Sequence, residues 1–217
     1  MHDLAITLSV NYSILAGFVF STAILGISPG PDNIFVLTQS LANGVKSGLS
    51  VVFGLASGCL VHTTLLAFGV SEIIKRSDTL FWCIKLFGIA YLLYLAFKVF
   101  KSEAHIEISS TNASKSGMQK LFWTGFTMNV LNPKVTIFFL AFFPGFLFSD
   151  QVSPVIQFYI LGFLFIGVTL LIFGGVALLS GSISKWIMSN SNAGRMLKWA
   201  QIIVFVGIAI YLLLSEK

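Results

Sequence analysis

Long apolar runs alternate with short polar segments along the whole chain. Six of the runs are long enough to cross a lipid bilayer as a helix, for which about 17 to 25 residues suffice. These runs cover residues 13–40, 48–71, 79–99, 121–147, 154–180 and 197–214. Apolar residues follow one another within each run instead of alternating with polar ones, which argues against a membrane β-barrel. The pattern therefore predicts an all-α membrane protein with six transmembrane helices.

Two of the six predicted spans are interrupted by proline near their middle. The first span contains SPGPDN at residues 28–33, and the fourth contains NPK at residues 132–134. Both spans are longer than one straight crossing needs at about 1.5 Å per residue. Proline lacks an N–H donor and clashes with the preceding turn, so carbonyl groups one turn earlier lose their partners. We therefore predict that the first and fourth helices are broken at proline.

A broken helix is costly in lipid, where unsatisfied backbone groups are tolerated only against protein or a wet cavity. The break also creates a half-helix N-terminus at mid-membrane, whose free N–H groups attract a carboxylate. Pro31 and Pro133 suit the first helical position, with Gly30 and Asn132 as caps. The two breaks therefore predict the two halves of a binding site, although proline and glycine also serve as simple kinks in membrane helices.

The two interruptions occupy matching positions in the two halves of the chain. Aligning Pro31 with Pro133 sets Asp32 opposite Lys134, and each motif is followed by a similar apolar run. The third spans of the halves also match, as GIAYLLYL and GIAIYLLL. Because each half holds three spans, homologous halves insert upside down relative to each other.

The chain is therefore expected to form one transmembrane domain over residues 1–217, made of two inverted three-helix repeats. The first repeat covers about residues 1–100 and the second about 120–217, with a polar, serine-rich loop at about 101–119 between them. Inverted repeats with paired broken helices are an architecture of transporters, in which the halves rock about a fixed site.

Composition supports the membrane interpretation. Of the 217 residues, 56% are hydrophobic and 10% are charged, and the mean hydropathy is +0.92. A soluble domain is nearer half apolar and about a quarter charged, so the apolar surplus must face lipid. The net charge of +5 does not indicate nucleic-acid binding, because no basic patch with interleaved aromatic residues is present.

Lysine and arginine lie mostly between the apolar runs, where they set the orientation in the membrane. One side holds Lys46, Lys98, Lys101, Lys115, Lys120, Lys185, Arg195 and Lys198. The other side holds Lys75, Arg76 and Lys217. The richer side is expected to be cytoplasmic, which leaves both termini on the periplasmic or extracellular side.

The chain resembles the LysE/RhtB family of bacterial amino-acid exporters over nearly its whole length. The resemblance is carried by SPGPDN, NGVKSGLSVVFGLASGCLVHTTLLAFGV, KLFGIAYLLYLAFK and NVLNPKVTIFFLAFFPGF. It implies a multi-pass protein of the bacterial inner membrane that exports an amino acid or similar small zwitterion, by proton antiport. The family pattern often has an acidic residue where this chain has Cys59, so that position receives no coupling role. The resemblance does not identify the substrate.

The candidate substrate-binding or coupling residues lie at the two breaks, with one histidine outside them. They are Pro29, Gly30, Pro31, Asp32, Asn33, Asn129, Asn132, Pro133, Lys134 and His62. Asp32 is the one acidic residue well inside a predicted span, and intramembrane carboxylates are functional by default. We expect it to carry protons or to pair with a substrate ammonium; the alternative is that it only stabilises its helix N-terminus.

The other candidates have more than one interpretation. Lys134 neutralises Asp32, attracts a substrate carboxylate or extends to the membrane surface. The asparagines contact substrate or cap the broken ends, and capping is favoured for Asn132. His62 relays protons or bonds to a neighbouring backbone.

No metal-ligand cluster, Ser/His/Asp arrangement or phosphate-binding loop is evident in the sequence, so neither an enzyme nor a cofactor is expected. The expected partners are a small-molecule substrate, protons and the lipid bilayer. Gly54 and Gly58 form a GxxxG motif that allows close helix contact, either within the fold or between the subunits of a homodimer.

Two other membrane functions stay open at this point. Cys59 and Cys83 both lie in apolar runs and would allow a transmembrane thiol relay, although neither is in a CxxC motif. A passive small-solute channel would also use paired half-helix ends to line its pore.

Overall fold

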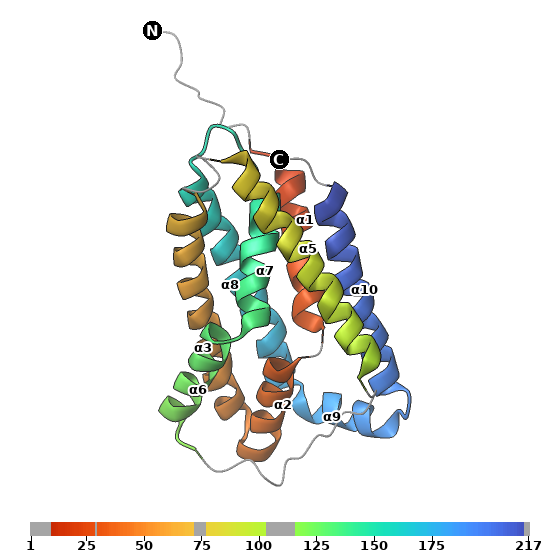
Figure 1. Cartoon of the computed structure of the whole chain (residues 1–217). Helices are drawn as coiled ribbons and strands as arrows, with labels where there is room; N and C mark the ends of the chain where they lie inside the picture. Colours follow the sequence, from red (N-terminus) through yellow and green to blue (C-terminus); the bar gives the residue numbers. More distant parts are fainter. Residues whose placement is uncertain (1–9, 29, 72–76, 103–115, 215–217) are drawn as a thin grey trace.

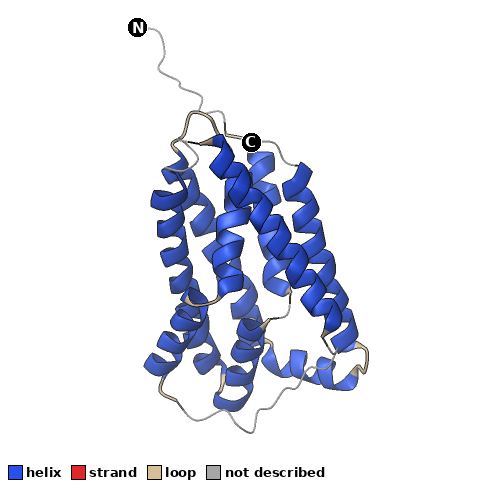
Figure 2. Ribbon diagram, in the orientation of Figure 1, coloured by secondary structure: helices blue, strands red, loops and turns tan. Residues whose placement is uncertain are grey.

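A computed structural model describes residues 10–28, 30–71, 77–102 and 116–214 (Figure 1). Within these ranges the chain is helical and contains no strand (Figure 2). The predicted all-α class is therefore confirmed for the described part of the chain.

The first half begins with α1 (Tyr12–Ile27), α2 (Pro31–Asn43) and α3 (Val45–Leu65), and α3 continues into the π-helical turn η1 (Leu66–Val70). It ends with α5 (Asp78–Lys101). The second half consists of α6 (Met118–Val130), α7 (Pro133–Phe142), the 3₁₀ turn η2 (Phe143–Phe146), α8 (Pro154–Leu178), α9 (Ser180–Ser189) and α10 (Ala193–Leu214).

Four of the described helices are each long and apolar enough to cross a membrane, namely Val45–Val70, Thr79–Lys101, Pro154–Leu178 and Ala193–Leu214. Two bent pairs bring the number of spans to as many as six. The chain bends by 60° between α1 and α2, and by 53° between α6 and the helix that begins at Pro133. Each second helix of a pair starts at its proline, so the predicted breaks are present.

The boundaries differ from the prediction in one place. Residues 180–189 were expected to belong to the end of the fifth span and the loop after it, but they form a separate helix, α9. In Figure 1, α9 lies across one end of the bundle instead of along it. Its sequence, SGSISKWIMS, combines exposed Lys185 and Trp186 with buried Ser180 and Ser184. A short mixed polar and apolar helix of this kind suits a membrane surface better than the lipid interior.

Glycine permits a close contact between the backbones of α3 and α6. A Cβ added at Gly54 would collide with the carbonyl oxygen of Phe122, and one added at Gly125 would collide with that of Val51. One added at Gly58 would lie 2.7 Å from the Asn129 side chain. The GxxxG motif is therefore covered by α6 of the same chain, which decides for the contact within the fold.

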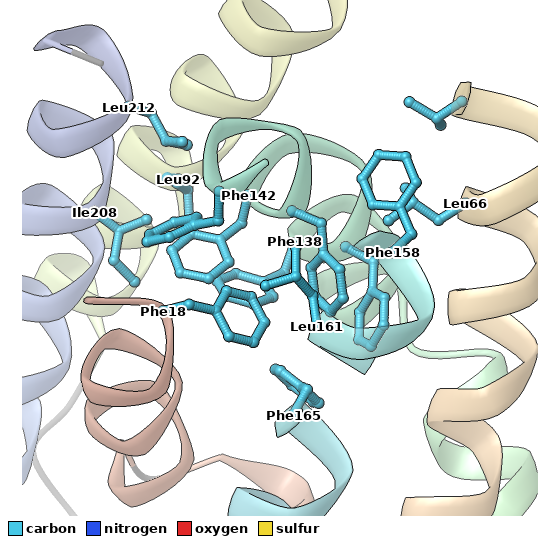
Figure 3. Packing of buried hydrophobic residues seen from close by; sticks show 14 of the residues in the cluster. Phe18, Leu66, Leu92, Phe138, Phe142, Phe158, Leu161, Phe165, Ile208 and Leu212 are labelled. Atoms are coloured by element: carbon cyan, nitrogen blue, oxygen red, sulfur yellow. The ribbon is translucent and has the colours of Figure 1, made fainter. Parts of the chain in front are cut away.

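Phenylalanine forms much of the core on the other side of the bundle (Figure 3). Phe138 stacks on Phe142 with ring centroids 4.3 Å apart, and Phe139 stacks on Phe143 at 4.2 Å. These pairs are four residues apart and so lie on one face of α7 and its continuation. Phe18 of α1 packs against the rings of Phe142 and Phe143. The core thereby fixes α7 directly after its break.

We expect Gly54→Ala to lower the stability of the folded protein by about 1–3 kcal/mol, because the methyl group forces α3 and α6 apart. Thermal unfolding of detergent-purified protein measures the change. Gly207→Ala is the matched control, since nothing lies within 4 Å of a Cβ at that position. Equal melting temperatures for the two variants would contradict the assigned contact.

Candidate functional site

The two breaks open onto one cavity with a volume of about 70 Å³. Its walls come from the end of α1, the first turn of α2, the end of α6 and the first turn of α7. Residues of α3 and α8 complete the lining. In Figure 1 both breaks lie part-way along the bundle, away from its two ends. Segments about a hundred residues apart in the chain thus meet inside the protein.

Asn132 links the two breaks to each other. Its side-chain oxygen accepts a hydrogen bond from the backbone N–H of Lys134 at 3.0 Å, which caps α7. Its side-chain nitrogen donates to Oδ2 of Asp32 at 3.4 Å. The capping role predicted for Asn132 is therefore confirmed, and the same amide also positions the carboxylate at the start of α2.

Asn33 satisfies the backbone that the first break exposes. Its side-chain nitrogen donates to the carbonyl oxygen of Gly26 at 2.9 Å and to that of Ser28 at 3.4 Å. Both carbonyls belong to the last turn of α1, where helical partners are missing. Of the two interpretations open for Asn33, the contacts show backbone capping, while its place in the cavity lining keeps it within reach of a ligand.

Lys134 lines the same cavity as Asp32 and attracts it electrostatically, without a direct ion-pair contact. Among the described residues no lysine or arginine nitrogen lies within ion-pair distance of the Asp32 carboxylate. The Lys134 ammonium instead lies 4.9 Å from the centre of the Phe205 ring, and 3.7 Å from the place of a Cβ at Gly30. Lys134 lines the cavity. The two opposite charges therefore share one cavity and interact across it.

Four buried oxygen atoms of the lining have no hydrogen-bond partner among the described residues. They are Thr22 Oγ1, Ser28 Oγ, Asp32 Oδ1 and Asn129 Oδ1. Buried polar atoms nearly always have partners in proteins. The Asp32 and Asn129 oxygens can only accept hydrogen bonds when the carboxylate is ionised. The Asp32 and Asn129 oxygens therefore lack donors in the described structure, which a bound molecule or water would supply.

Asn129 connects the cavity to His62 behind it. His62 Nε2 lies 3.2 Å from the carbonyl oxygen of Asn129, and the Asn129 side chain contacts Cys59 Sγ at 3.6 Å. Cys59 and Asn129 line the cavity, whereas His62 packs against the ring of Phe139 and does not. The structure thus shows the backbone contact for His62 and places it one layer away from the site.

The remaining candidates are placed as follows. Gly30 and Pro31 line the cavity, Pro133 is exposed at the start of α7, and Pro29 lies outside the described residues. The described residues contain no group of three or more His, Cys, Asp or Glu side chains placed to hold a metal ion.

The sequence analysis did not identify two hydroxyl groups of the cavity lining or the residues that α8 contributes to it. Thr22 and Ser28 of the α1 end carry two of the four unpartnered oxygens, and α8 supplies Phe165, Val168, Thr169 and Phe173. Thr169 is an isolated hydroxyl residue within an apolar run, and that isolation is the signal that could have identified it.

The helices and the cavity define a polytopic α-helical membrane protein in which two broken helices meet at a buried polar site. The chain belongs to the LysE type translocator family, whose sequence model matches residues 23–216. The resemblance noted from the motifs is therefore confirmed.

The chain matches relatives in this family over most of their length. A homoserine/homoserine lactone efflux protein of Salmonella typhimurium is 29% identical over 78% of this chain and 82% of its own. A leucine efflux protein of Klebsiella pneumoniae is 29% identical over 92% of this chain and 93% of its own. An uncharacterized membrane protein of Bacillus subtilis is 31% identical over 63% and 68%, respectively. No solved structure matches the chain significantly.

We expect Asn33→Ala to destabilise the protein by about 1–3 kcal/mol, because two buried carbonyl groups lose their donor. The measurement is thermal unfolding in detergent, followed by tryptophan fluorescence. Gln119→Ala removes an amide from an exposed position in the first turn of α6 and serves as the control. If both variants unfold together with the unchanged protein, Asn33 does not support the break.

Proposed function

We propose that this protein exports an amino acid or similar small zwitterion across the bacterial inner membrane, in exchange for protons. The observation that carries the proposal is the pair of opposite charges, Asp32 and Lys134, which line one cavity without a direct ion-pair contact. A molecule with an ammonium and a carboxylate complements both. The homoserine and leucine efflux proteins among the relatives support the same class of substrate and the direction of transport.

The substrate ammonium is expected at the Asp32 end. Thr22, Ser28, Asp32 and Asn129 each present an unpartnered oxygen there. An ammonium has three donors and no acceptor, so it suits a site made of acceptors. Hydrogen bonds between charged groups of this kind are the strong ones.

The substrate carboxylate is expected between Lys134 and the backbone N–H groups at the start of α2. The ammonium of Lys134 lies beside Gly30, the N-cap of α2. The first turn of a helix carries backbone N–H groups without helical partners and the positive end of the helix dipole. Gly30 has no side chain, so a carboxylate could approach these groups closely.

Competition between a proton and the substrate ammonium for Asp32 couples proton entry to substrate export. Oδ1 of Asp32 is free of protein partners among the described residues, so it can take either a proton or the substrate ammonium. When a proton binds the carboxylate, its charge is lost and the substrate ammonium is released. When the proton leaves toward the cytoplasm, the carboxylate binds the next substrate. A proton gradient directed inward therefore drives the substrate outward.

Alternating access requires that two related helix pairs adopt different packing. If the halves are inverted repeats, α3 against α6 corresponds to α8 against α1. A Cβ at Gly54 or Gly125 would collide with backbone across the α3–α6 contact. At Gly26 of α1, by contrast, it would meet the tip of the Ile172 side chain of α8, at 2.9 Å. The difference supports a tightly packed α3–α6 pair and a more loosely packed α1–α8 pair. If the two pairs exchanged these packing states, the cavity would open to the other side of the membrane.

The orientation proposed is the one expected from the lysine and arginine distribution. The start of α1 and the end of α10 lie at one end of the bundle in Figure 1. The start of α3, the end of α5 and the helix α9 lie at the opposite end. These segments carry Lys46, Lys98, Lys101 and Lys185. That end is assigned to the cytoplasm by the positive-inside rule.

The thiol relay and the passive channel predict other outcomes. Both cysteines are free; Cys59 is buried and Cys83 is exposed. Export that survives replacement of both by serine removes the relay, and uphill export driven by a pH gradient removes the channel.

We expect Asp32→Asn to leave the protein folded but to reduce pH-gradient-driven uphill export to the level of empty vesicles, because the amide cannot carry a proton. Amino-acid uptake into inside-out proteoliposomes measures export. Asp150→Asn, at an exposed loop position, is the matched control and should export normally. Normal coupled export by Asp32→Asn would remove Asp32 from the mechanism.

We expect Lys134→Met to raise the KM of the exported amino acid by about 10- to 100-fold, since the substrate carboxylate loses a charged hydrogen-bond donor. Initial export rates at increasing substrate concentration give the value. Lys120→Met, at an exposed position of α6, serves as the control. An unchanged KM would place the carboxylate elsewhere.

A further inference from the structure

Beyond its two charges, the cavity has a third, apolar part. Phe138 of α7 and Phe165, Val168 and Phe173 of α8 line it, and Thr169 of α8 adds a single hydroxyl to the same lining. Among the described lining residues, Asp32 and Lys134 are the two that carry a charge. The proposed function assigns these to the ammonium and the carboxylate that every α-amino acid has. No charged group in the described lining is left for a substrate side chain.

We propose that the exported amino acid has an uncharged, apolar side chain, which binds against Phe138, Phe165, Val168 and Phe173. This inference rests on the proposed function and names its substrate class. A second ammonium or carboxylate on the side chain would be buried without a partner, which is strongly unfavourable. Lysine, arginine, aspartate and glutamate are therefore rejected.

Two rings of this apolar wall are held firmly by the core. Phe138 is 3% exposed and stacks on Phe142 at 4.3 Å. Phe165 is 8% exposed and meets Phe139 edge-on at 4.9 Å. Figure 3 shows both rings within the buried cluster. A close-packed wall cannot move aside without disturbing its neighbours, so Phe138 and Phe165 limit the length of the side chain that fits.

The apolar wall also discriminates between substrate side chains that have similar shapes but differ in polarity. Homoserine and norvaline have nearly the same shape, but homoserine ends in a hydroxyl group where norvaline ends in a methyl. An apolar wall favours the methyl by about tenfold. Each methylene added within the limit of the wall raises the affinity by about fourfold.

The test uses the purified full-length protein in proteoliposomes with an imposed pH gradient. Export is measured for alanine, 2-aminobutyrate, norvaline, homoserine, leucine, phenylalanine, lysine and glutamate. We expect the KM to fall about fourfold per methylene from alanine to norvaline, and to be about tenfold higher for homoserine than for norvaline. Lysine and glutamate should remain at background.

Phe165→Ala and the milder Phe165→Leu should lengthen the accepted side chain, raising kcat/KM for phenylalanine relative to norvaline by about tenfold. Phe163→Ala is the matched control, because Phe163 lies on the same helix and is 61% exposed. It should keep the specificity of the unchanged protein. The substrate series on the unchanged protein does not depend on the folding of any variant.

The outcomes separate this inference from the function on which it rests. Export of lysine or glutamate as efficient as that of norvaline would overturn the apolar side-chain site but leave amino-acid export standing. So would a KM that does not vary from alanine to norvaline, or a specificity that folded Phe165 variants leave unchanged. Absence of export for every amino acid would overturn the proposed function itself.

Discussion

Every backbone group freed by a helix break inside a bilayer must find a partner, because lipid offers none. Two asparagine side chains meet most of this requirement. Asn33 donates to the carbonyl groups of Gly26 and Ser28 at the end of α1, and Asn132 caps the helix that follows the second break. Asn132 also reaches Asp32 on the other broken helix. The amides that make the breaks tolerable therefore also place a carboxylate at the centre of the protein.

Tight packing of the surrounding helices fixes the positions of the two breaks relative to each other. Glycines bring α3 and α6 into backbone contact, which fixes the end of α6 beside the cavity. Stacked phenylalanines hold α7 directly after its proline (Figure 3). Between the two lies a cavity that Asp32 and Lys134 both line without a direct ion-pair contact. Such separated charges are costly in a membrane, and a zwitterion that offsets both is the ligand class that they favour.

Much of the site could be predicted because its polar residues stand out in an apolar sequence. Pro31, Asp32, Asn132 and Lys134 interrupt runs in which nearly every neighbour is hydrophobic, and the structure brings all but Pro133 and His62 of the described candidates to the cavity lining. The helix α9 was not predicted, because its polar residues resemble those of a loop. For His62 the structure shows the backbone contact, one of its two interpretations; the sequence could not choose between them, because a polar residue inside a span does not reveal which neighbour it faces.

The sequence by itself determined the helical membrane class, the number of long apolar runs and the positions of the two breaks. Run length and proline chemistry depend only on local residues, so they can be read along the chain. Only the tertiary structure decided that Thr22, Ser28 and the wall of α8 face the cavity. A helix that is apolar on all sides has no amphipathic direction, so its facing residues are chosen by the helices that pack around it.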